Sequence, residues 1–524
     1  MIRAPSPQEK LAEALDALHQ LQKRGVVAIK SGDLSRAHRE RLLESGFLKE
    51  VLKGWYVASR PDEAAGDSTA WYASFWDFCA AYLTERFGTE WCLSPEQSIA
   101  LHAGNRTVPP QLLVRSPKGN NKPTDLLHGT SLFDVRYAMP KASDVVERDG
   151  LRLYSVPAAL VAITEQFFHR ASTDVRAAMA TVRDASDVLT LLLEGGHSTI
   201  AGRLAGAFRN AGQTRIANDI VKTMEAAGYT VRETDPFTTR PGIGLSARET
   251  SLYVNRLRLM WDAMRQPVLD IFPAEPGIPR DAAAYLKAVD EVYVNDAYHS
   301  LSIEGYRVSA ELIERVRSGT WNPEENPEDR DNRNALAARG YYDAFTSVKA
   351  SVGKVLGGAN AGQVAGADHG DWYRQLFGPS VTAGIIKATD LAGYRTGAVY
   401  IRRSMHMPPP RKAVRDCMPV LFELLEAETE PAIRVVLGHF VFVYIHPYFD
   451  GNGRMGRFLM NLMLASGGYP WTIVPVERRK DYMAALESAS VGQDIRPFAR
   501  FLAGLVEAGL RGEGAPPVPG TRPS

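Results

Sequence analysis

The 524-residue sequence has three cysteines, no long apolar run and almost no net charge, and each of these shortages excludes a class of protein. Cys79, Cys92 and Cys417 are far apart, which argues against a disulfide scaffold or a cysteine zinc site. No run approaches the roughly 18 apolar residues of a membrane-spanning helix, so we expect no membrane partner. The first residues lack the apolar core of a signal peptide, so we expect a cytoplasmic location.

What is present indicates a large globular chain. Hydrophobic residues make up 45% and charged residues 23% of the sequence, and the formal net charge is +1. A chain this close to neutrality has no overall field that attracts nucleic acid or membrane. Its length predicts roughly two to four domains.

The stretch that carries most chemistry is His446-Pro-Tyr-Phe-Asp450-Gly-Asn-Gly-Arg454-Met-Gly-Arg457. Before it, apolar residues recur at helical spacing over 433–445, which predicts a buried helix ending at His446. Pro447 disfavours helix at His446, and the segment 451–453 can adopt positive φ values that aim backbone N–H groups into one concavity. The helical pattern resumes at Arg454. The sequence therefore predicts an anion-binding loop at a helix N-terminus.

The side chains of this stretch suit a polyphosphate. Asp450 offers a hard oxygen ligand for Mg²⁺, which proteins hold through one or two carboxylates and substrate phosphates. His446, with an ordinary pKa near neutrality, is the natural general base for a hydroxyl nucleophile. Arg454 and Arg457 are three residues apart and project from one side of a helix. The alternative is a structural histidine followed by a glycine-rich turn, but packing alone does not require this whole set together.

The stretch resembles the motif of the Fic family, His-x-Phe-x-Asp/Glu-Gly-Asn-Gly-Arg-x-x-Arg, at every charged and glycine position; Tyr448 stands where the family usually has Phe. The resemblance implies transfer of AMP from ATP to a Ser, Thr or Tyr hydroxyl of a target protein or of the chain itself. It implies that His446 deprotonates that hydroxyl and that Asp450 holds Mg²⁺. The phosphates would lie against Gly451, Asn452, Gly453, Arg454 and Arg457.

A second resemblance lies upstream. The segment Ser300-Leu-Ser-Ile-Glu304-Gly305 ends a predicted helix near 290–305 and is similar to the inhibitory motif of many Fic proteins. The resemblance implies that Glu304 pairs with Arg457 and blocks the seat of the γ-phosphate. A carboxylate and a phosphate compete for the same guanidinium. The alternative is that Glu304 only ends a helix at a Gly305 cap.

Two further segments extend the resemblance. Residues 393–403 resemble the family's flap hairpin, in which Thr396, Gly397 and Val399 would pair with an extended target segment; a plain surface hairpin is the alternative. Tyr482 falls where family members contact the nucleotide. Met483 and Ser490 replace the second tyrosine and the asparagine that often accompany it, so donors carrying UMP or GMP stay open beside ATP.

The first 60 residues predict a winged helix of two short helices and a small hairpin. Its second helix carries Arg36, Arg39 and Arg41, candidates for contacts with DNA. Glutamates share that helix, so a protein-docking module is the alternative. With the region that follows, this part resembles the AbiEi-type antitoxins of toxin–antitoxin systems, which implies a DNA-binding module. The residues that carry this resemblance are Leu34-Ser35-Arg36, Gly46-Phe47-Leu48, Gly54-Trp55-Tyr56 and the segment 93–104.

We therefore expect a mainly α protein: a helical Fic domain with a small β-hairpin flap, preceded by a winged helix and an α/β antitoxin-like domain. The expected boundaries are 1–60 for the winged helix, 61–238 for the α/β domain, 239–246 for a linker, 247–510 for the Fic domain and 511–524 for a disordered tail. The glycine- and alanine-rich segment 352–370 predicts a flexible insertion.

The expected activity is that of an autoinhibited protein adenylyltransferase with ATP as co-substrate and Mg²⁺ as cofactor. Two alternatives stay open: removal of AMP from a modified protein, and a DNA-binding regulator whose Fic domain senses nucleotide. The oligomeric state is open too, a homodimer included.

Overall fold

The computed structural model describes residues 6–61, 68–242, 251–321 and 333–518. It confirms the expected fold class, with 59% helix, 7% strand and small sheets only. The chain divides into two compact units. Unit 1 comprises residues 1–256 and 400–407, and unit 2 comprises residues 257–399 and 408–524. The predicted linker at 239–246 lies outside the described residues from 243 onward.

The first part of unit 1 is a pair of helices on a three-stranded antiparallel sheet of order β1-β3-β2. Its elements are α1 (Pro7–Lys23), β1 (Ile29–Lys30), α2 (Arg36–Glu44), β2 (Leu48–Leu52) and β3 (Trp55–Ala58). Ser6 and Glu9 form a capping box at the start of α1, in which each side chain accepts from the other residue's backbone N–H. Leucines of both helices, Leu18, Leu21 and Leu42, form a small core with the sheet.

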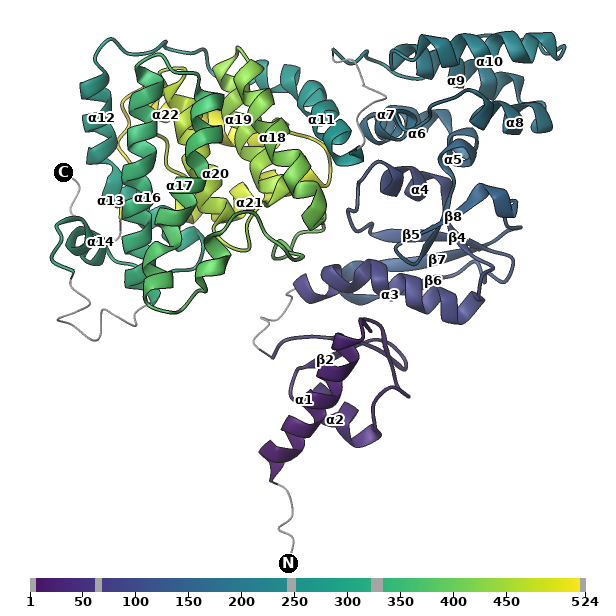
Figure 1. The fold of residues 1–524 in the computed structure, drawn as a ribbon, viewed down its shortest axis with the longest axis horizontal. Helices are drawn as coiled ribbons and strands as arrows, with labels where there is room; N and C mark the ends of the chain where they lie inside the picture. Colours follow the sequence, from purple (N-terminus) through teal and green to yellow (C-terminus); the bar gives the residue numbers. More distant parts are fainter. Residues whose placement is uncertain (1–5, 62–67, 243–250, 322–332, 519–524) are drawn as a thin grey trace, which may run out of the picture. The chain divides into compact units, whose positions relative to one another are not determined.

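A four-stranded sheet of order β4-β5-β7-β6 follows, with β5 and β7 parallel, and α3 packs beside it (Figure 1). These elements are α3 (Thr69–Phe87), β4 (Cys92–Leu93), α4 (Pro95–His102), β5 (Gln111–Ser116), β6 (Pro123–Asp125), β7 (Ser131–Arg136), β8 (Val145–Arg148) and β9 (Leu151–Tyr154). Helices complete the unit: α5 (Val156–Ala162), α6 (Glu165–Arg170), α7 (Ser172–Met179), α8 (Ser186–Gly195), α9 (Ser198–Asn210) and α10 (Thr214–Ala226). The aromatic side chains of α3 supply much of the core, because Trp71, Phe75 and Phe78 are at most 1% exposed.

Unit 2 is helical, and its longest helices lie side by side (Figure 1). Helix α11 (Leu252–Leu269) begins in unit 1 and ends in unit 2. The other helices are α12 (Ala282–Glu291), α13 (Tyr293–Ile303), α14 (Ala310–Arg317), α16 (Arg333–Leu356), α17 (Ala361–Thr382), α18 (Arg411–Ala427), α19 (Pro431–Ile445), α20 (Asn452–Ala465), α21 (Arg479–Ser490) and α22 (Arg496–Leu510).

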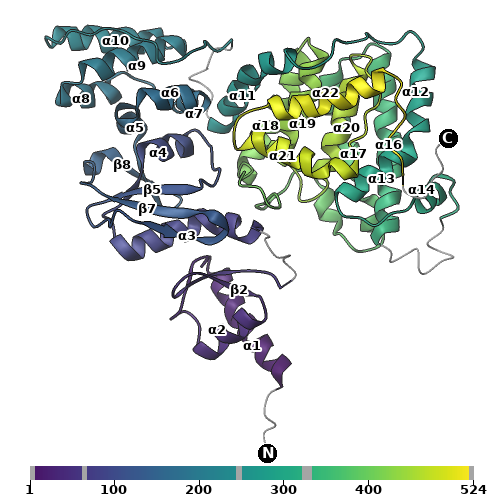
Figure 2. The same ribbon diagram turned by 180° about the vertical axis from the view of Figure 1, so that it is seen from behind.

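Helix α19 is the centre of unit 2. It contacts α18, α20, α21 and α22, and the last two lie in front of it in Figure 2. The predicted helix before His446 is therefore confirmed, and its apolar face from Ile433 to Ile445 is buried. Burial on all sides of α19 holds its C-terminal end, and with it the first residue of the motif, in a fixed place.

The prediction of a flexible insertion at 352–370 was wrong, because α16 and α17 occupy most of it. The glycines there serve close helix packing. A Cβ on Gly362 of α17 would lie 2.3 Å from the backbone nitrogen of Glu426 in α18. Similarly, a Cβ on Gly340 of α16 would lie 2.1 Å from the carbonyl oxygen of Leu376 in α17.

The predicted β-hairpin flap at 393–403 was also wrong, because the described residues of that segment form no strand. The Arg395 N–H donates to the Pro447 carbonyl at 2.9 Å, and the Thr396 carbonyl accepts from the Arg411 guanidinium at 2.9 Å. These backbone groups bond to other segments, so they do not pair across a hairpin.

The expected disordered tail, 511–524, is described as far as residue 518. In this part residues 511–515 are exposed, the Pro516 carbonyl accepts from Asn295, and Val518 is 2% exposed. The tail residues after 518 lie outside the described part of the chain. Within the described residues, none of the helices is long and apolar enough to cross a membrane.

Candidate functional site

The loop between α19 and α20 has two residues in the left-handed region. His446 ends α19 with φ 53°, and Gly451 precedes α20 with φ 79°. Helix α20 begins at Asn452, two residues before the expected start at Arg454. Only Gly451 of the segment 451–453 has positive φ, so the N–H groups of the first turn of α20 form the anion-binding feature.

His446 is oriented by its own helix. Its Nδ1 lies 3.2 Å from the Val443 carbonyl, which can only accept, so Nδ1 carries the proton. Nε2 then has a free lone pair, and nothing in the described residues bonds to it. Burial lowers the pKa of His446 to about 4, against the opposing effect of the Val443 hydrogen bond. The imidazole is therefore neutral at neutral pH, as a proton acceptor must be.

Asn452 shapes the loop through its side chain. Its Oδ1 accepts from the Tyr448 N–H at 2.9 Å, and its Nδ2 donates to the Tyr448 carbonyl at 2.8 Å. Both ends of the Asn452 amide are thereby bonded inside the protein, and the residue is 2% exposed. The Tyr448 ring stacks on Tyr373 at 3.7 Å between centroids and 7° between planes. The loop is thus fixed by two hydrogen bonds and one ring stack.

Asp450 is the most exposed charged group of the motif, with 58% of its side chain exposed. Its Oδ1 accepts from the Gly451 N–H at 2.6 Å, and its Oδ2 lies 3.4 Å from Arg454. No cluster of three or more metal-ligating side chains occurs within 6–61, 68–242, 251–321 or 333–518. One exposed carboxylate fits Mg²⁺ that takes its other ligands from substrate phosphates and water.

Arg454 and Arg457 are buried, with 1% and 4% of their side chains exposed. The Arg454 guanidinium lies 5.2 Å from the Tyr306 ring and 5.0 Å from the Phe377 ring, which fixes its plane. Among the described residues, Arg454 Nε and Arg457 Nη1 are buried without a hydrogen-bond partner. An unpaired buried guanidinium N–H is costly, and a phosphate oxygen is the ligand that removes that cost.

Glu304 bonds to one of these two arginines, Arg457. Arg457 Nη2 donates to Glu304 Oε1 at 2.8 Å and to the Ser300 carbonyl at 3.0 Å, while Nε donates to Ser300 Oγ at 2.9 Å. Burial raises the pKa of Glu304, but Arg457 and Arg454 outweigh it and hold the pKa below its usual value. The Glu304 carboxylate is therefore charged against Arg457.

Two glycines allow this contact. Gly305, with φ 87°, ends α13 directly after Glu304. A Cβ on Gly453 would lie 2.3 Å from Glu304 Oε1, so only glycine leaves room for the carboxylate above the first turn of α20.

Comparison with known proteins identifies the segment that contains this loop. Residues 371–464 match the model of the Fic/DOC family. This segment is therefore similar to a Fic domain. The chain is 36% identical over 119 residues to protein adenylyltransferase fic-1 of Caenorhabditis elegans, a match covering 22% of this chain and 23% of that one. It is 29% identical over 232 residues to protein adenylyltransferase Fic of Drosophila grimshawi, covering 44% of each. The matched stretches span less than half of either relative.

A solved structure of residues 134–508 of Fic-1 from C. elegans is 21% identical, with 66% of this chain and 96% of that one covered and a TM-score of 0.37. At that score we infer nothing from the likeness. The helical class follows from the described elements, and the likeness of residues 371–464 to the Fic/DOC family follows from the family model.

Tyr482, expected at the nucleotide, lies beneath the Fic loop instead of on its surface. The residue is 1% exposed, and its hydroxyl lies 2.7 Å from Nε2 of His439, which is fully buried. Burial raises the pKa of Tyr482 to about 12, and Arg457 acts in the opposite direction. Tyr482 therefore packs near Arg457 and His439 in the interior of unit 2.

Sequence reasoning missed Arg395, which is 2% exposed beneath the expected flap. Its Nε donates to the His446 carbonyl at 2.8 Å, and its Nη1 donates to the Gly397 carbonyl at 3.0 Å. It thus ties the segment of Thr396 and Gly397 to the backbone of the proposed base. The signal was a lone arginine in an otherwise uncharged stretch, Gly393–Ile401. Val399 is the last residue of this segment in unit 2, since residues 400–407 belong to unit 1.

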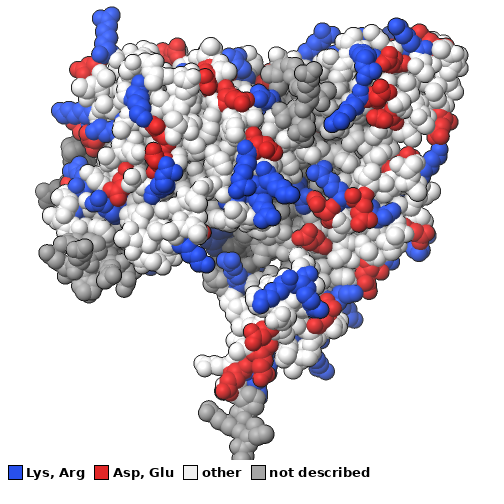
Figure 3. All heavy atoms as spheres, viewed as in Figure 1, with Lys and Arg blue, Asp and Glu red and all other residues white. Residues whose placement is uncertain are grey.

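The arginines of α2 have partners within unit 1. Arg36 pairs with Glu40 at 2.7 Å, Arg39 donates to the Ser31 carbonyl at 2.6 Å, and Arg41 donates to the Lys10 carbonyl at 3.1 Å. Side chains of both signs cover the part of Figure 3 in which α1 and α2 lie. The three arginines are therefore not a set of uncommitted cations.

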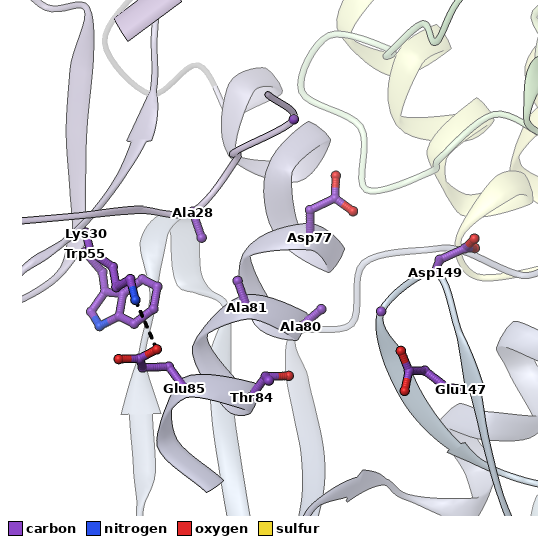
Figure 4. Close-up of a pocket in the computed structure, with 12 residues that line it drawn as sticks. Ala28, Lys30, Trp55, Asp77, Ala80, Ala81, Thr84, Glu85, Glu147 and Asp149 are labelled. Atoms are coloured by element: carbon purple, nitrogen blue, oxygen red, sulfur yellow. Dashed lines mark hydrogen bonds and ion pairs between the residues drawn. The ribbon is translucent and has the colours of Figure 1, made fainter. Parts of the chain in front are cut away.

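Unit 1 also contains a cavity of about 570 Å³ beside α3 (Figure 4). Acidic side chains line it, but Lys30 pairs with Glu85 at 3.0 Å and Asp149 with Arg106 at 2.8 Å. Burial raises the pKa of Asp77 in its wall. Every residue that lines it belongs to unit 1, and none belongs to the Fic motif.

Proposed function

We propose that the chain is a protein adenylyltransferase of Fic type that Glu304 holds inactive. The observation that carries the proposal is the state of Arg457. It donates to Glu304 with one nitrogen, and a second buried nitrogen, Nη1, has no partner in the part of the chain that the structure describes. The names of the relatives support AMP transfer from ATP to protein.

In the proposed reaction, the hydroxyl oxygen of a target Ser, Thr or Tyr attacks the α-phosphorus of ATP. A new P–O bond forms to the target, the bond between the α-phosphorus and the α–β bridging oxygen breaks, and pyrophosphate leaves. The hydroxyl proton passes to Nε2 of His446, whose lone pair is free because Nδ1 donates to Val443. Arg395 fixes the backbone of this base through the His446 carbonyl.

The phosphates would lie at the N-terminus of α20, against the N–H groups that follow Gly451. Arg454 Nε and Arg457 Nη1 would reach the β and γ end, where negative charge has to be neutralised as pyrophosphate leaves. Asp450 would hold Mg²⁺ against these phosphates, and the ion supplies charge neutralisation for the leaving group.

Glu304 inhibits in this proposal by competition. Its carboxylate lies against Arg457 where a γ-phosphate oxygen would bind, and a Cβ on Gly453 would already collide with it. Nucleotide can then bind productively only after the carboxylate leaves. Removing the carboxylate frees Arg457 from Glu304 while its bonds to Ser300 stay, and it does not change His446 or Asp450.

Two alternatives stay predictions. Removal of AMP from a modified protein would use the same loop, with Glu304 orienting water. The winged-helix and AbiEi-like reading of the first 60 residues implies DNA binding, but the contacts of Arg36, Arg39 and Arg41 within unit 1 favour neither DNA nor a docking partner. No observation raises either above AMP transfer.

The test is transfer of label from ATP labelled at the α-phosphate, with Mg²⁺, onto the protein itself or proteins of a lysate. Three forms are compared: wild type, Glu304→Gly, and Glu304→Gly with His446→Ala. We expect weak labelling by wild type, strong labelling by Glu304→Gly, and none by the double variant, because His446 is the base.

Absence of transfer by Glu304→Gly with ATP, GTP, CTP and UTP would overturn the proposal. Release of AMP from a pre-modified protein would then favour the reverse activity. Arg36→Ala is the matched control, since it removes an exposed arginine from the other unit and should leave labelling unchanged.

A further inference from the structure

The described C-terminal residues turn back from α22 onto helix α13. Helix α22 ends at Leu510, and the Glu513 N–H donates to the Ala508 carbonyl as the chain reverses. The Pro516 carbonyl then accepts from Nδ2 of Asn295 at 2.7 Å, and Nε2 of His299 lies 3.3 Å from it. Val518 is 2% exposed. One carbonyl and one apolar side chain thus anchor this segment.

His299 connects the segment to a second one. Its Nδ1 accepts from the Val476 N–H at 3.2 Å, so Nε2 carries the proton and donates to the Pro516 carbonyl. The His299 ring is fully buried. Residues from three places in the chain therefore meet at this ring: α13, the short 3-10 turn Val476–Arg478 that precedes α21, and the C-terminal segment.

The anchored helix is the one that carries the inhibitory contact. Asn295 and His299 are one helical turn apart on α13. Ser300, on the same helix, and Glu304, its C-cap residue, bond to Arg457. At the end of α13, Arg479 Nε donates to the Ile303 carbonyl at 2.7 Å. The position of Glu304 over Arg457 thus depends on the position of α13, which these contacts set.

Two prolines reduce the entropic cost of holding the C-terminal segment on α13. Pro516 and Pro517 restrict the backbone to extended conformations, so little freedom is lost when the segment lies on α13. Removing it would expose the Asn295 amide, the buried His299 ring and the apolar site of Val518 at once.

We propose that residues 511–518 form a C-terminal strap that stabilises α13 in its inhibitory position, so that loss or capture of the strap releases Glu304 from Arg457. The proposal rests on the proposed function for its catalytic readout. The strap contacts contribute only while α13 is in this position, so a partner that binds the strap shifts the population toward the active form.

The experiment compares the full chain, a chain ending at Arg511, and Asn295→Ala, each with Glu304 and with Glu304→Gly. With Glu304 present, both changes should raise label transfer roughly threefold to tenfold, as expected for the loss of a hydrogen bond and a buried side chain. In the Glu304→Gly background neither should change transfer, because the inhibitory contact is already gone. Glu513→Gln is the matched control, because it changes an exposed strap side chain that pairs with Arg511 and leaves the backbone bond from Glu513 to Ala508 in place.

A second readout does not need catalysis. Backbone hydrogen exchange over residues 293–303 should become faster when the strap is removed, and a peptide of residues 511–518 added to the shortened chain should restore protection. The strap proposal would be overturned by unchanged backbone hydrogen exchange in both variants, or by an equal rise of label transfer with and without Glu304. Failure of the adenylyltransferase proposal shows separately, as absence of transfer by Glu304→Gly while the exchange experiment still gives its answer.

Discussion

Helices α2 and α20 both carry arginines close together in sequence, yet these arginines differ in every physical respect. Arg36 on α2 is 84% exposed and paired with Glu40, and its neighbours bond to backbone carbonyls of unit 1. Arg454 and Arg457 on α20 are at most 4% exposed, and each has a buried N–H without a partner in the described residues. The first set is satisfied within the protein, and the second keeps buried N–H groups that are unpaired among the described residues.

The difference shows why residue type and spacing are weak guides to binding. An exposed arginine with a partner costs nothing and needs no ligand. A buried arginine with an unpaired N–H carries a desolvation cost, which a fold retains only where something offsets it. The following predictions test whether the two helices differ in function as they differ in burial.

The largest effect is expected at Arg457. In the Glu304→Gly background, Arg457→Lys removes the planar fork that can hold Ser300 and a phosphate together. Label transfer should fall about a hundredfold or more. Arg39→Lys on α2, made in the same background, should leave transfer within twofold. Equal effects at the two sites would mean that burial does not separate them.

Asn452→Ala should both destabilise the protein and weaken transfer. The change leaves the Tyr448 N–H and carbonyl without their partner in a buried loop. The free energy of unfolding should fall by about 1–3 kcal/mol. Transfer by the Glu304→Gly form should fall by more than the unfolded fraction explains, because the loop also sets the start of α20. Denaturant unfolding and label transfer are measured on the same sample; a loss of stability alone would make Asn452 purely structural.

The pH dependence of stability should report on His439. Burial lowers the pKa of His439 to about 3, against an ordinary value of 6.5. Between these two pH values the unfolded chain therefore binds a proton at this residue and the folded chain does not. Stability from this residue is complete above the unfolded pKa and is lost as pH falls toward 3. The slope is at most about 1.4 kcal/mol per pH unit. In His439→Gln, the urea concentration at the unfolding midpoint should depend less on pH between pH 6.5 and 4.5. The same slope in the variant as in wild type would show that other groups cause the dependence.

The smallest effect is expected at the start of α2. Ser35 caps this helix by accepting from the His38 N–H at 3.2 Å. Ser35→Ala should lower the free energy of unfolding by about 1 kcal/mol. Unlike Asn452→Ala, it should leave transfer by the Glu304→Gly form unchanged once the unfolded fraction is considered. A parallel loss of transfer would connect the first 60 residues to the Fic domain.

Sequence patterns predicted the parts of the fold that depend on local periodicity. The buried helix 433–445 follows from apolar residues at helical spacing. The same reasoning was wrong at 352–370, where glycine and alanine indicated flexibility. There the small side chains allow α17 to pack closely on α16 and α18, a role that is visible only when the neighbouring helices are in place.

The hairpin predicted at 393–403 was wrong for a related reason. Its turn-like composition is local, but the backbone groups of Arg395 and Thr396 bond to Pro447 and Arg411, which are distant in sequence. Tyr482 likewise has the residue type expected at a nucleotide but lies buried against His439.

By itself, the sequence determined which residues could do chemistry, because the spacing of His446, Asp450, Arg454 and Arg457 on a helix–loop–helix is a local property. Only the tertiary structure decided which donors are unpaired. It also decided that Glu304, 153 residues before Arg457, reaches that guanidinium, and that Pro516 lies on the helix that carries Glu304. The burial of a residue and its hydrogen-bond partners depend on what packs against it, and in a helical unit the neighbours come from segments far apart in the chain.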